Sequence, residues 1–203
     1  MNFSFLPEKI YHVYSHAVSR DNLFRNSENY NFFLEKFKAY IPQVAETFAF
    51  CLLPNHFHFL IRVKSEIEIK NYYYQKFKTE DKHDISKRVS LQFSHLLNSY
   101  SQAFNRLNHR KGTLFMSRIQ RKEINDDYYF SRVMGYIHVN PIKHGLVKSY
   151  HDWEFSSYRM YLNDEKDFIL KEEGISWFGS KEAFIVFHEE FKQEFMNLDD
   201  IVK

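Results

Sequence analysis

The sequence predicts an α+β protein in which helices pack on a mainly antiparallel sheet. Strand and helix patterns follow one another in the order strand, helix, strand, strand, helix, strand, helix. The chain has 203 residues, of which 44% are hydrophobic, so it is long and apolar enough to bury a sizeable core. Neither an internal repeat nor a low-complexity tract is visible. These observations favour one domain, with decorations or with an extension.

The first half of the chain contains three strand patterns and one helix pattern. Residues 10–18 (IYHVYSHAV) are rich in good strand formers. A helix opens at residues 27–29 and carries apolar residues at helical spacing until Pro42. Residues 48–53 form an apolar run typical of a buried strand, and residues 56–63 alternate as a second strand. The two strands are predicted to form either a hairpin or one bent strand.

The second half is predicted to hold a charged loop with some helix, then three helices separated by an extended segment. A proline disfavours helical backbone in the residue before it, so Pro141 is expected to stop the second of these helices. In chain order the elements are the loop at 64–88, a helix at 89–107, an extended segment at 113–124, a helix from an Asn125 cap to about Asn140, and a helix near 181–195.

Composition limits the class of protein. The formal net charge is +2 and the pI about 8.4, which by itself does not indicate a nucleic-acid partner. The single cysteine, Cys51, allows no intramolecular disulfide and fits a reducing compartment. No signal peptide and no run long enough for a membrane span is visible. We therefore expect a cytoplasmic protein without a membrane partner, whose many Phe side chains mostly fill a core.

Two histidines on one strand form the first chemical motif. Side chains alternate along a strand, so His56 and His58 point to one face while Phe57 and Phe59 point to the other. Two neighbouring imidazoles can ligate a divalent cation. The alternative is that both are polar residues on the solvated face of an amphipathic strand.

A tyrosine and an asparagine on a helix form the second motif. Tyr136 and Asn140 are four residues apart, so they lie one above the other on a helix surface. Tyr129 and Arg132 lie near the same stripe, whereas Phe130, Val133 and Ile137 are better placed for packing. Each member of the pair also has a structural explanation, Tyr136 as a half-buried tyrosine and Asn140 as a helix terminator before Pro141.

Together these motifs resemble a known family. Residues 53–58 (LPNHFH) followed by 136–147 (YIHVNPIKHGLV) are similar to the single-tyrosine transposases of the HUH superfamily, and most similar to the branch associated with repetitive extragenic palindromes (REP). Residues 11–20 (YHVYSHAVSR), 112–118 (GTLFMSR) and 152–158 (DWEFSSY) also resemble that branch. The likeness covers about residues 8–162.

The resemblance implies a fold and a set of roles. It implies a ferredoxin-like or RRM-like core over residues 1–162, with residues 163–203 as an extension of unassigned role. Tyr136 would be the nucleophile, and His56, His58 and Asn140 would hold Mg²⁺ or Mn²⁺. The family's third ligand lies one helical turn after its tyrosine, where some relatives carry glutamine and this chain has Asn140.

The implied reaction is cleavage and rejoining of single-stranded or hairpin DNA. Attack by Tyr136 would leave a 5′-phosphotyrosine and a free 3′-hydroxyl, and a new 3′-hydroxyl could reverse the step without ATP. Some members of the wider family act as dimers, so a homodimer is also open. Basic residues that flank the motifs are the candidate DNA contacts: Arg20, Arg25, Arg110, Lys111, Arg118, Arg121 and Lys143.

Three alternatives remain open from the sequence. The first is a nickase of the replication-initiator or relaxase type, which would use the same residues. The second is an RRM-like nucleic-acid-binding module, or a domesticated transposase, that binds without cutting. The third is a structural-zinc protein, which the single cysteine and the lack of a closed four-ligand set disfavour.

Overall fold

The computed structural model describes residues 4–19, 21–78, 83–116, 119–165 and 167–201, with side chains described up to residue 196. Its regular elements, in chain order, are β1 (Ile10–His16), α1 (Ser27–Tyr40), the 3₁₀ turn η1 (Ile41–Gln43), β2 (Ala45–Leu53), β3 (His56–Val63), α2 (Glu66–Phe77), α3 (Ile85–Leu107), β4 (Gln120–Ile124), α4 (Asp127–Lys143), η2 (Tyr150–Asp152), α5 (Tyr158–Leu162), α6 (Lys171–Ser176) and α7 (Lys181–Ile201).

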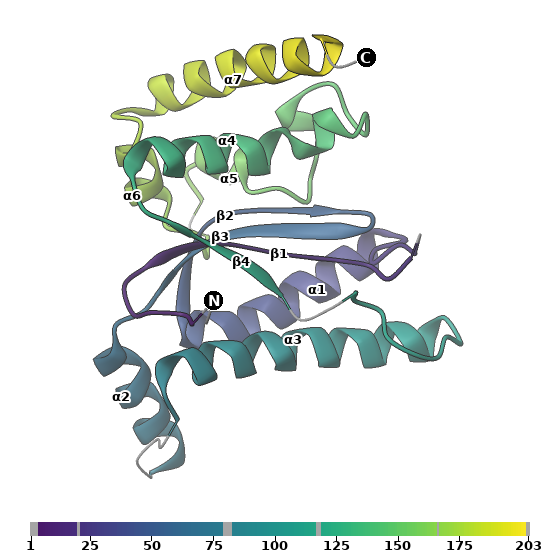
Figure 1. Ribbon diagram of the computed structural model, residues 1–203, viewed down its shortest axis with the longest axis vertical. Coiled ribbons are helices and arrows are strands. Elements are labelled where there is room, and N and C mark those ends of the chain that lie inside the picture. The colour runs from purple at the N-terminus through teal and green to yellow at the C-terminus, as the bar shows by residue number, and fades with distance from the viewer. Residues whose placement is uncertain (1–3, 20, 79–82, 117–118, 166, 202–203) are drawn as a thin grey trace.

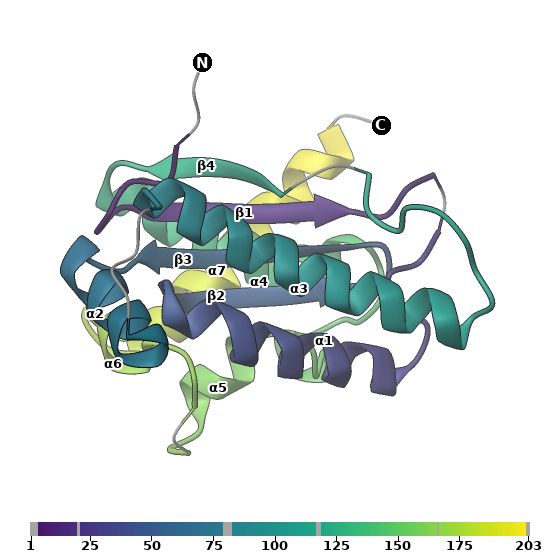
Figure 2. The ribbon, with the colours of Figure 1, turned by 90° about the horizontal axis from the view of Figure 1, so that it is seen from below.

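A four-stranded antiparallel sheet forms the centre of the fold. Its strand order is β2-β3-β1-β4, and each neighbouring pair is antiparallel. Helices α1 and α3 cover one face of the sheet, while α4 covers the other face with α7 above it (Figures 1 and 2). This order, with one helix after β1 and another before β4, is the ferredoxin-like arrangement. The predicted α+β class with a packed antiparallel sheet is confirmed.

The β2–β3 hairpin fixes which side chains face which helices. Leu53 pairs with His56 across the turn at residues 54–55, so the two segments are a hairpin and not one bent strand. On one face of β3, the ring of Phe59 stacks on Phe37 of α1 at 4.0 Å between centroids, and Phe57 meets Phe33 at 5.1 Å. The predicted alternation of β3 is therefore confirmed, and the histidines are left on the opposite face.

The charged segment after β3 is more helical than predicted. Residues expected to be a loop form α2, which begins with a capping box in which Ser65 and Glu68 satisfy each other's backbone amides. Helix α3 also begins earlier than expected, at Ile85, because the carboxylate of Asp84 accepts a hydrogen bond from the amide of Lys87. In the described part of the expected extended segment 113–124, β4 pairs as a strand and Phe115 forms an isolated bridge with Ala17.

Helix α4 differs from the prediction at both ends. Asp126, not Asn125, is the N-cap, and its carboxylate accepts from the amide of Tyr129 at 2.7 Å. Pro141 does not stop the helix, which continues to Lys143. A proline in the last turn removes only one backbone hydrogen bond, and burial of Pro141 and Ile142 holds this turn in place.

The residues after position 162 pack against the rest of the fold. Arg132 of α4 forms a two-pronged ion pair with Glu194 of α7 at 2.9 and 3.0 Å. The helices approach closely at Gly135, where an added Cβ would lie 3.0 Å from the ring of Phe187. Helix α7, expected to span about residues 181–195, extends to Ile201. Tertiary packing thus places α7 over the helix that carries Tyr136.

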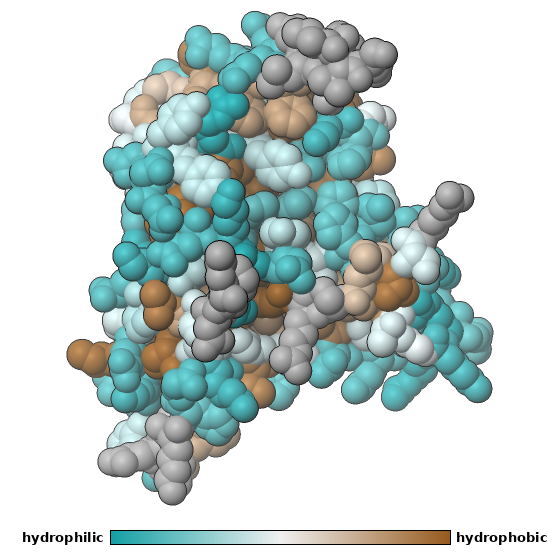
Figure 3. All heavy atoms as spheres, in the orientation of Figure 1, coloured by the Kyte–Doolittle hydropathy of each residue, from teal (hydrophilic) through white to brown (hydrophobic). Residues whose placement is uncertain are grey.

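The surface is mainly polar where it can be seen. On the face in Figure 3, hydrophilic side chains dominate and apolar ones occur in small scattered groups. Among the helices of the described residues, none has the length and apolar character needed to cross a membrane.

Candidate functional site

Two neighbouring strands bring a cluster of polar rings to the sheet face beneath α4. Tyr14 of β1 pairs with His58 of β3, and His16 pairs with His56, so these four side chains share one face. His12 lies two residues before Tyr14 on the same face. The sequence pattern drew attention to the two histidines of β3, while those of β1 were missed. Their signal was the same alternation, with polar residues at every second position of β1.

Helix α4 holds Tyr136 against this cluster. The Tyr136 ring packs edge-on to His58, with centroids 5.5 Å apart, and to His12, with centroids 6.1 Å apart. Phe130, Ile137 and Val139 are fully buried and fix the helix on the sheet. As predicted, apolar residues of this helix pack in the core while Tyr136 faces the histidines.

Hydrogen bonds hold both histidines of β3. His56 Nδ1 lies 2.7 Å from Asn55 Oδ1, and because that oxygen can only accept, Nδ1 carries the proton. His58 Nδ1 lies 2.9 Å from His12 Nε2 in a buried contact. In each case the bond engages Nδ1 and leaves the Nε2 atom for another partner.

Burial keeps these imidazoles neutral at pH 7. Desolvation is the largest cause for each, and it lowers the pKa of His56 to about 3, that of His12 to about 4, and that of His58 well below its usual range. Neighbouring histidines add to the effect at His56 and His58, and Lys122 does so at His12. A neutral imidazole is the form that ligates a metal.

Two buried atoms near this cluster have no partner within the described residues. They are Nε2 of His58 and Oδ1 of Asn140. The amide nitrogen of Asn140 donates to the backbone carbonyl oxygen of Tyr136 at 2.7 Å, which leaves Oδ1 unsatisfied. Unpaired buried polar atoms are costly, so their presence favours a bound species that completes them.

The donor set fits a divalent ion. Within the described residues, no three His, Cys, Asp or Glu side chains form a metal-binding group. The predicted set differs from such a group because an amide oxygen joins two imidazoles, and this mixture of nitrogen and oxygen donors suits Mn²⁺ and is compatible with Mg²⁺. Asn140 is fully buried and lies one helical turn behind Tyr136.

The phenol of Tyr136 is half-buried and protonated at neutral pH. Burial raises its pKa above the ordinary value, the Asn140 side chain partly offsets this, and Tyr14 adds to it. The Nζ atom of Lys143 lies 5.7 Å from the Tyr136 ring and 4.9 Å from the ring of Phe195 on α7. Tyr136 is therefore bordered by a cation and by the C-terminal helix.

His56, His58 and Tyr136 line one cleft of about 680 Å³ between the sheet, α4 and α7, whereas the buried Asn140 is not part of its lining. Three basic residues border it, namely Lys122, Arg132 and Lys143. Arg132 is engaged by Glu194, whereas Lys143 has no ion pair with the described residues. Its full lining is His12, Tyr14, His16, Asn55, His56, His58, Lys122, Tyr129, Arg132, Val133, Tyr136, Lys143, His144, Phe191 and Phe195.

Of the five candidate DNA contacts that the structure describes, only Lys143 lies in this cleft. Arg20 and Arg118 fall outside the described residues. The other four lie elsewhere. Arg25 donates to Asn108, Arg110 pairs with Asp21 at 2.7 Å, Lys111 is exposed beyond the end of α3, and Arg121 stacks over Phe5.

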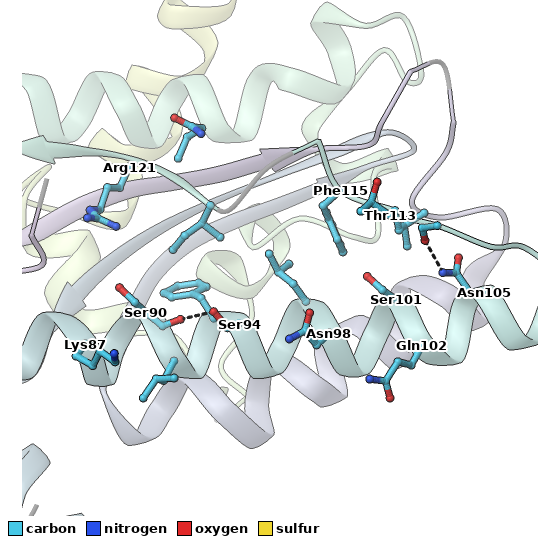
Figure 4. A pocket seen from close by; sticks show the side chains of 17 residues that line it. Lys87, Ser90, Ser94, Asn98, Ser101, Gln102, Asn105, Thr113, Phe115 and Arg121 are labelled. Carbon is cyan, nitrogen blue, oxygen red and sulfur yellow. Dashed lines mark hydrogen bonds between the residues drawn. The ribbon is translucent and has the colours of Figure 1, made fainter. Parts of the chain in front are cut away.

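A larger groove of about 1130 Å³ lies on the opposite side of the sheet, between α3 and the segment leading into β4. Figure 4 shows Ser90, Ser94 and Asn98 along α3, with Lys87 and Arg121 near one end. Its described lining contains no tyrosine, histidine or carboxylate. Without histidine, tyrosine or carboxylate side chains, the described part of this groove lacks the paired histidines and the tyrosine found in the smaller cleft.

The fold and the cleft together define a class of protein: a ferredoxin-like sheet with paired histidines on its face, beneath a tyrosine-bearing helix. This is the arrangement that the resemblance to single-tyrosine transposases implied. No model of a known protein family matches the chain.

Two comparisons lead to one branch of that class. Over 123 residues, the chain is 28% identical to a protein of Haemophilus influenzae named "Putative REP-associated tyrosine transposase". The match covers 59% of this chain and 62% of the relative, less than two thirds of that relative's length. The fold is similar to a solved structure described as "Structure of the REP associates tyrosine transposase bound to a REP hairpin", with a TM-score of 0.60 and 16% identity over 80% of this chain and 84% of that one. The resemblance to the REP-associated tyrosine transposases is thereby confirmed.

Proposed function

We propose that this chain cuts and rejoins single-stranded DNA through Tyr136, in the manner of a transposase. The observation that carries the proposal is the contact of the Tyr136 ring with His58, whose Nε2 atom is buried and unpartnered. Two similarities support the same conclusion. The sequence is similar to a protein that is named a transposase, and the fold is similar to that of a transposase bound to a hairpin. The proposed substrate is therefore DNA that carries a hairpin.

The proposed chemistry is a transesterification at phosphorus. The oxygen of Tyr136 forms a bond to the scissile phosphorus, and the bond from phosphorus to the 3′ oxygen breaks. The phenol proton ends, in the net reaction, on the 3′-hydroxyl that leaves. The products are a 5′-phosphotyrosine and a free 3′-hydroxyl, so the reverse reaction with a new 3′-hydroxyl joins strands without an external energy source.

Residues of the cleft prepare this step. Burial keeps the phenol protonated at neutral pH, so Tyr136 needs an activated phosphate more than a pre-formed phenolate. Lys143 and Lys122 place positive charge where the backbone phosphates would enter. His56, His58 and Asn140 are proposed to hold Mg²⁺ or Mn²⁺, which when bound neutralises charge on the nonbridging phosphate oxygens. All these residues come from one chain, so the proposal does not require a homodimer.

The test is capture of the covalent adduct. Purified protein is incubated with 3′-end-labelled, hairpin-bearing single-stranded oligonucleotides of varied sequence, in the presence of Mg²⁺ or Mn²⁺, and run on a denaturing gel. A labelled band at protein size is expected for the wild type and for Tyr128→Phe, a control on the same helix that is exposed and lies outside the lining of the cleft. Tyr136→Phe, Asn140→Ala and a chelator-treated sample should each reduce the band to background.

The outcomes separate the competing functions. An adduct that persists in Tyr136→Phe would disprove the assignment of the nucleophile. An adduct that resists the chelator would remove the metal from the proposal. DNA binding without an adduct across the whole panel would identify the chain as a binding module that does not cut.

A further inference from the structure

His12 lies beside a proposed metal ligand but has no role in the reaction proposed above. It lies on β1, is 8% exposed, and its Nε2 atom is 2.9 Å from Nδ1 of His58. The rings of His12 and His58 are nearly parallel, with centroids 5.0 Å apart. Antiparallel pairing of β1 with β3 fixes this contact, because the two residues lie on the same face of adjacent strands.

The hydrogen bond has two arrangements, and burial selects one of them. A neutral imidazole carries one proton, so either His58 Nδ1 donates to His12 or it accepts from it. If it accepted, the proton of His58 would sit on Nε2, a buried atom without a partner. An unsatisfied N–H there would bring a desolvation penalty and would block that nitrogen as a ligand.

We infer that His12 is a positioning residue that accepts the Nδ1 proton of His58 and thereby keeps the lone pair of His58 Nε2 free for a divalent cation. The inference rests on the proposed metal site. His12 acts here as Asn55 acts for His56, since each is a hydrogen-bond acceptor beside Nδ1 of a β3 histidine. Partners of this kind orient a ligating histidine and fix its tautomer.

Other neighbours of His58 cannot take this role within the described residues. The Tyr14 ring is tilted at 5.9 Å, the His56 ring is edge-on at 5.0 Å, and the Tyr136 ring is edge-on at 5.5 Å. None of them forms a hydrogen bond to His58, whereas His12 does. His12 therefore alone sets the orientation of the imidazole from the side of Nδ1.

The test uses variants of the full chain and two readouts other than activity. His12→Leu removes the acceptor, and His12→Gln keeps a carbonyl oxygen at this position. His95→Leu is the control, since it removes an exposed histidine of α3, outside the lining of the cleft. Long-range proton–nitrogen NMR of the metal-free protein reports the tautomer of His58, and electron paramagnetic resonance of free Mn²⁺ reports metal affinity.

The wild type is expected to show the Nδ1–H tautomer of His58. His12→Leu should weaken Mn²⁺ binding by about 10- to 100-fold, with His12→Gln retaining most of the affinity and His95→Leu changing it little. An Nε2–H tautomer in the wild type, or equal losses in His12→Leu and His95→Leu, would overturn the inference. If the wild type bound no Mn²⁺, the proposed metal site would fail, while the tautomer spectrum would still decide the role of His12.

Discussion

A buried chain of hydrogen bonds joins α4 to α7 and makes the stability of the folded protein depend on pH. His188 Nδ1 donates to the carbonyl oxygen of Phe184 at 2.7 Å, so its Nε2 must accept from His138 Nδ1, 2.8 Å away. His138 Nε2 in turn accepts from the hydroxyl of Ser157 at 2.8 Å. The bond from His138 needs the lone pair on His188 Nε2, so His188 must be neutral, and all three side chains are buried.

The size of the pH effect on stability follows from the lowered pKa of His188. Burial is the largest cause and lowers its pKa from 6.5 to about 4, against a smaller opposing effect of the Phe184 carbonyl. The folded state therefore binds fewer protons than the unfolded state between about pH 6.5 and pH 4, so stability is full above this window and falls as the pH drops through it. From pH 7 to pH 5, proton linkage at this residue alone gives a loss of about 2 kcal/mol.

The assay is urea denaturation of the wild type and of His188→Gln at pH 7 and pH 5. Glutamine can still accept from His138 but does not titrate, so the variant should lose about 2 kcal/mol less than the wild type over this range. His151→Gln, which removes an exposed histidine, should leave the pH dependence unchanged. Equal losses in the wild type and in His188→Gln would show that this buried histidine does not govern the acid sensitivity.

Two further predictions concern packing and charge. In Gly174→Ala the new Cβ would lie 2.3 Å from the hydroxyl of Tyr161, which is buried and donates to Phe48 at 2.6 Å. The variant should be destabilised by about 1–3 kcal/mol despite the better helix propensity of alanine, and an unchanged melting temperature would disprove this. Lys143→Gln should reduce the salt slope of single-stranded DNA binding by about 0.7, whereas Lys38→Gln on the far side of the sheet should not, and equal slopes for the two variants would place the DNA elsewhere.

Local patterns in the sequence were sufficient for the elements with strong periodicity. Alternation along β3 separates Phe57 and Phe59 from His56 and His58, and the structure has both sets on the expected faces. The predicted helix that carries Tyr136 and Asn140 is also present, as α4. These predictions succeeded because side-chain direction within one element follows from backbone geometry alone.

Predictions failed where a local signal was overlooked, where packing outweighs propensity, or where they relied on charge alone. The charged segment 64–88 was expected to be mostly loop, although the Ser65–Glu68 capping box was visible and α2 forms there. Pro141 was expected to end α4, but the buried residues of the last turn keep it helical. Basic residues near a motif in the sequence also proved a poor guide to the cleft. Arg25, Arg110, Lys111 and Arg121 all lie outside its lining.

The sequence by itself determined the α+β class, the paired histidines of β3 and the tyrosine of α4. Only the tertiary structure decided that β1 pairs beside β3, so that His12 reaches His58, and that α7 lies over α4 and borders Tyr136. The physical reason is the range of the interactions. Side-chain direction is local, whereas strand neighbours and helix packing are set by contacts between residues far apart in the chain, and no pattern within one segment encodes them.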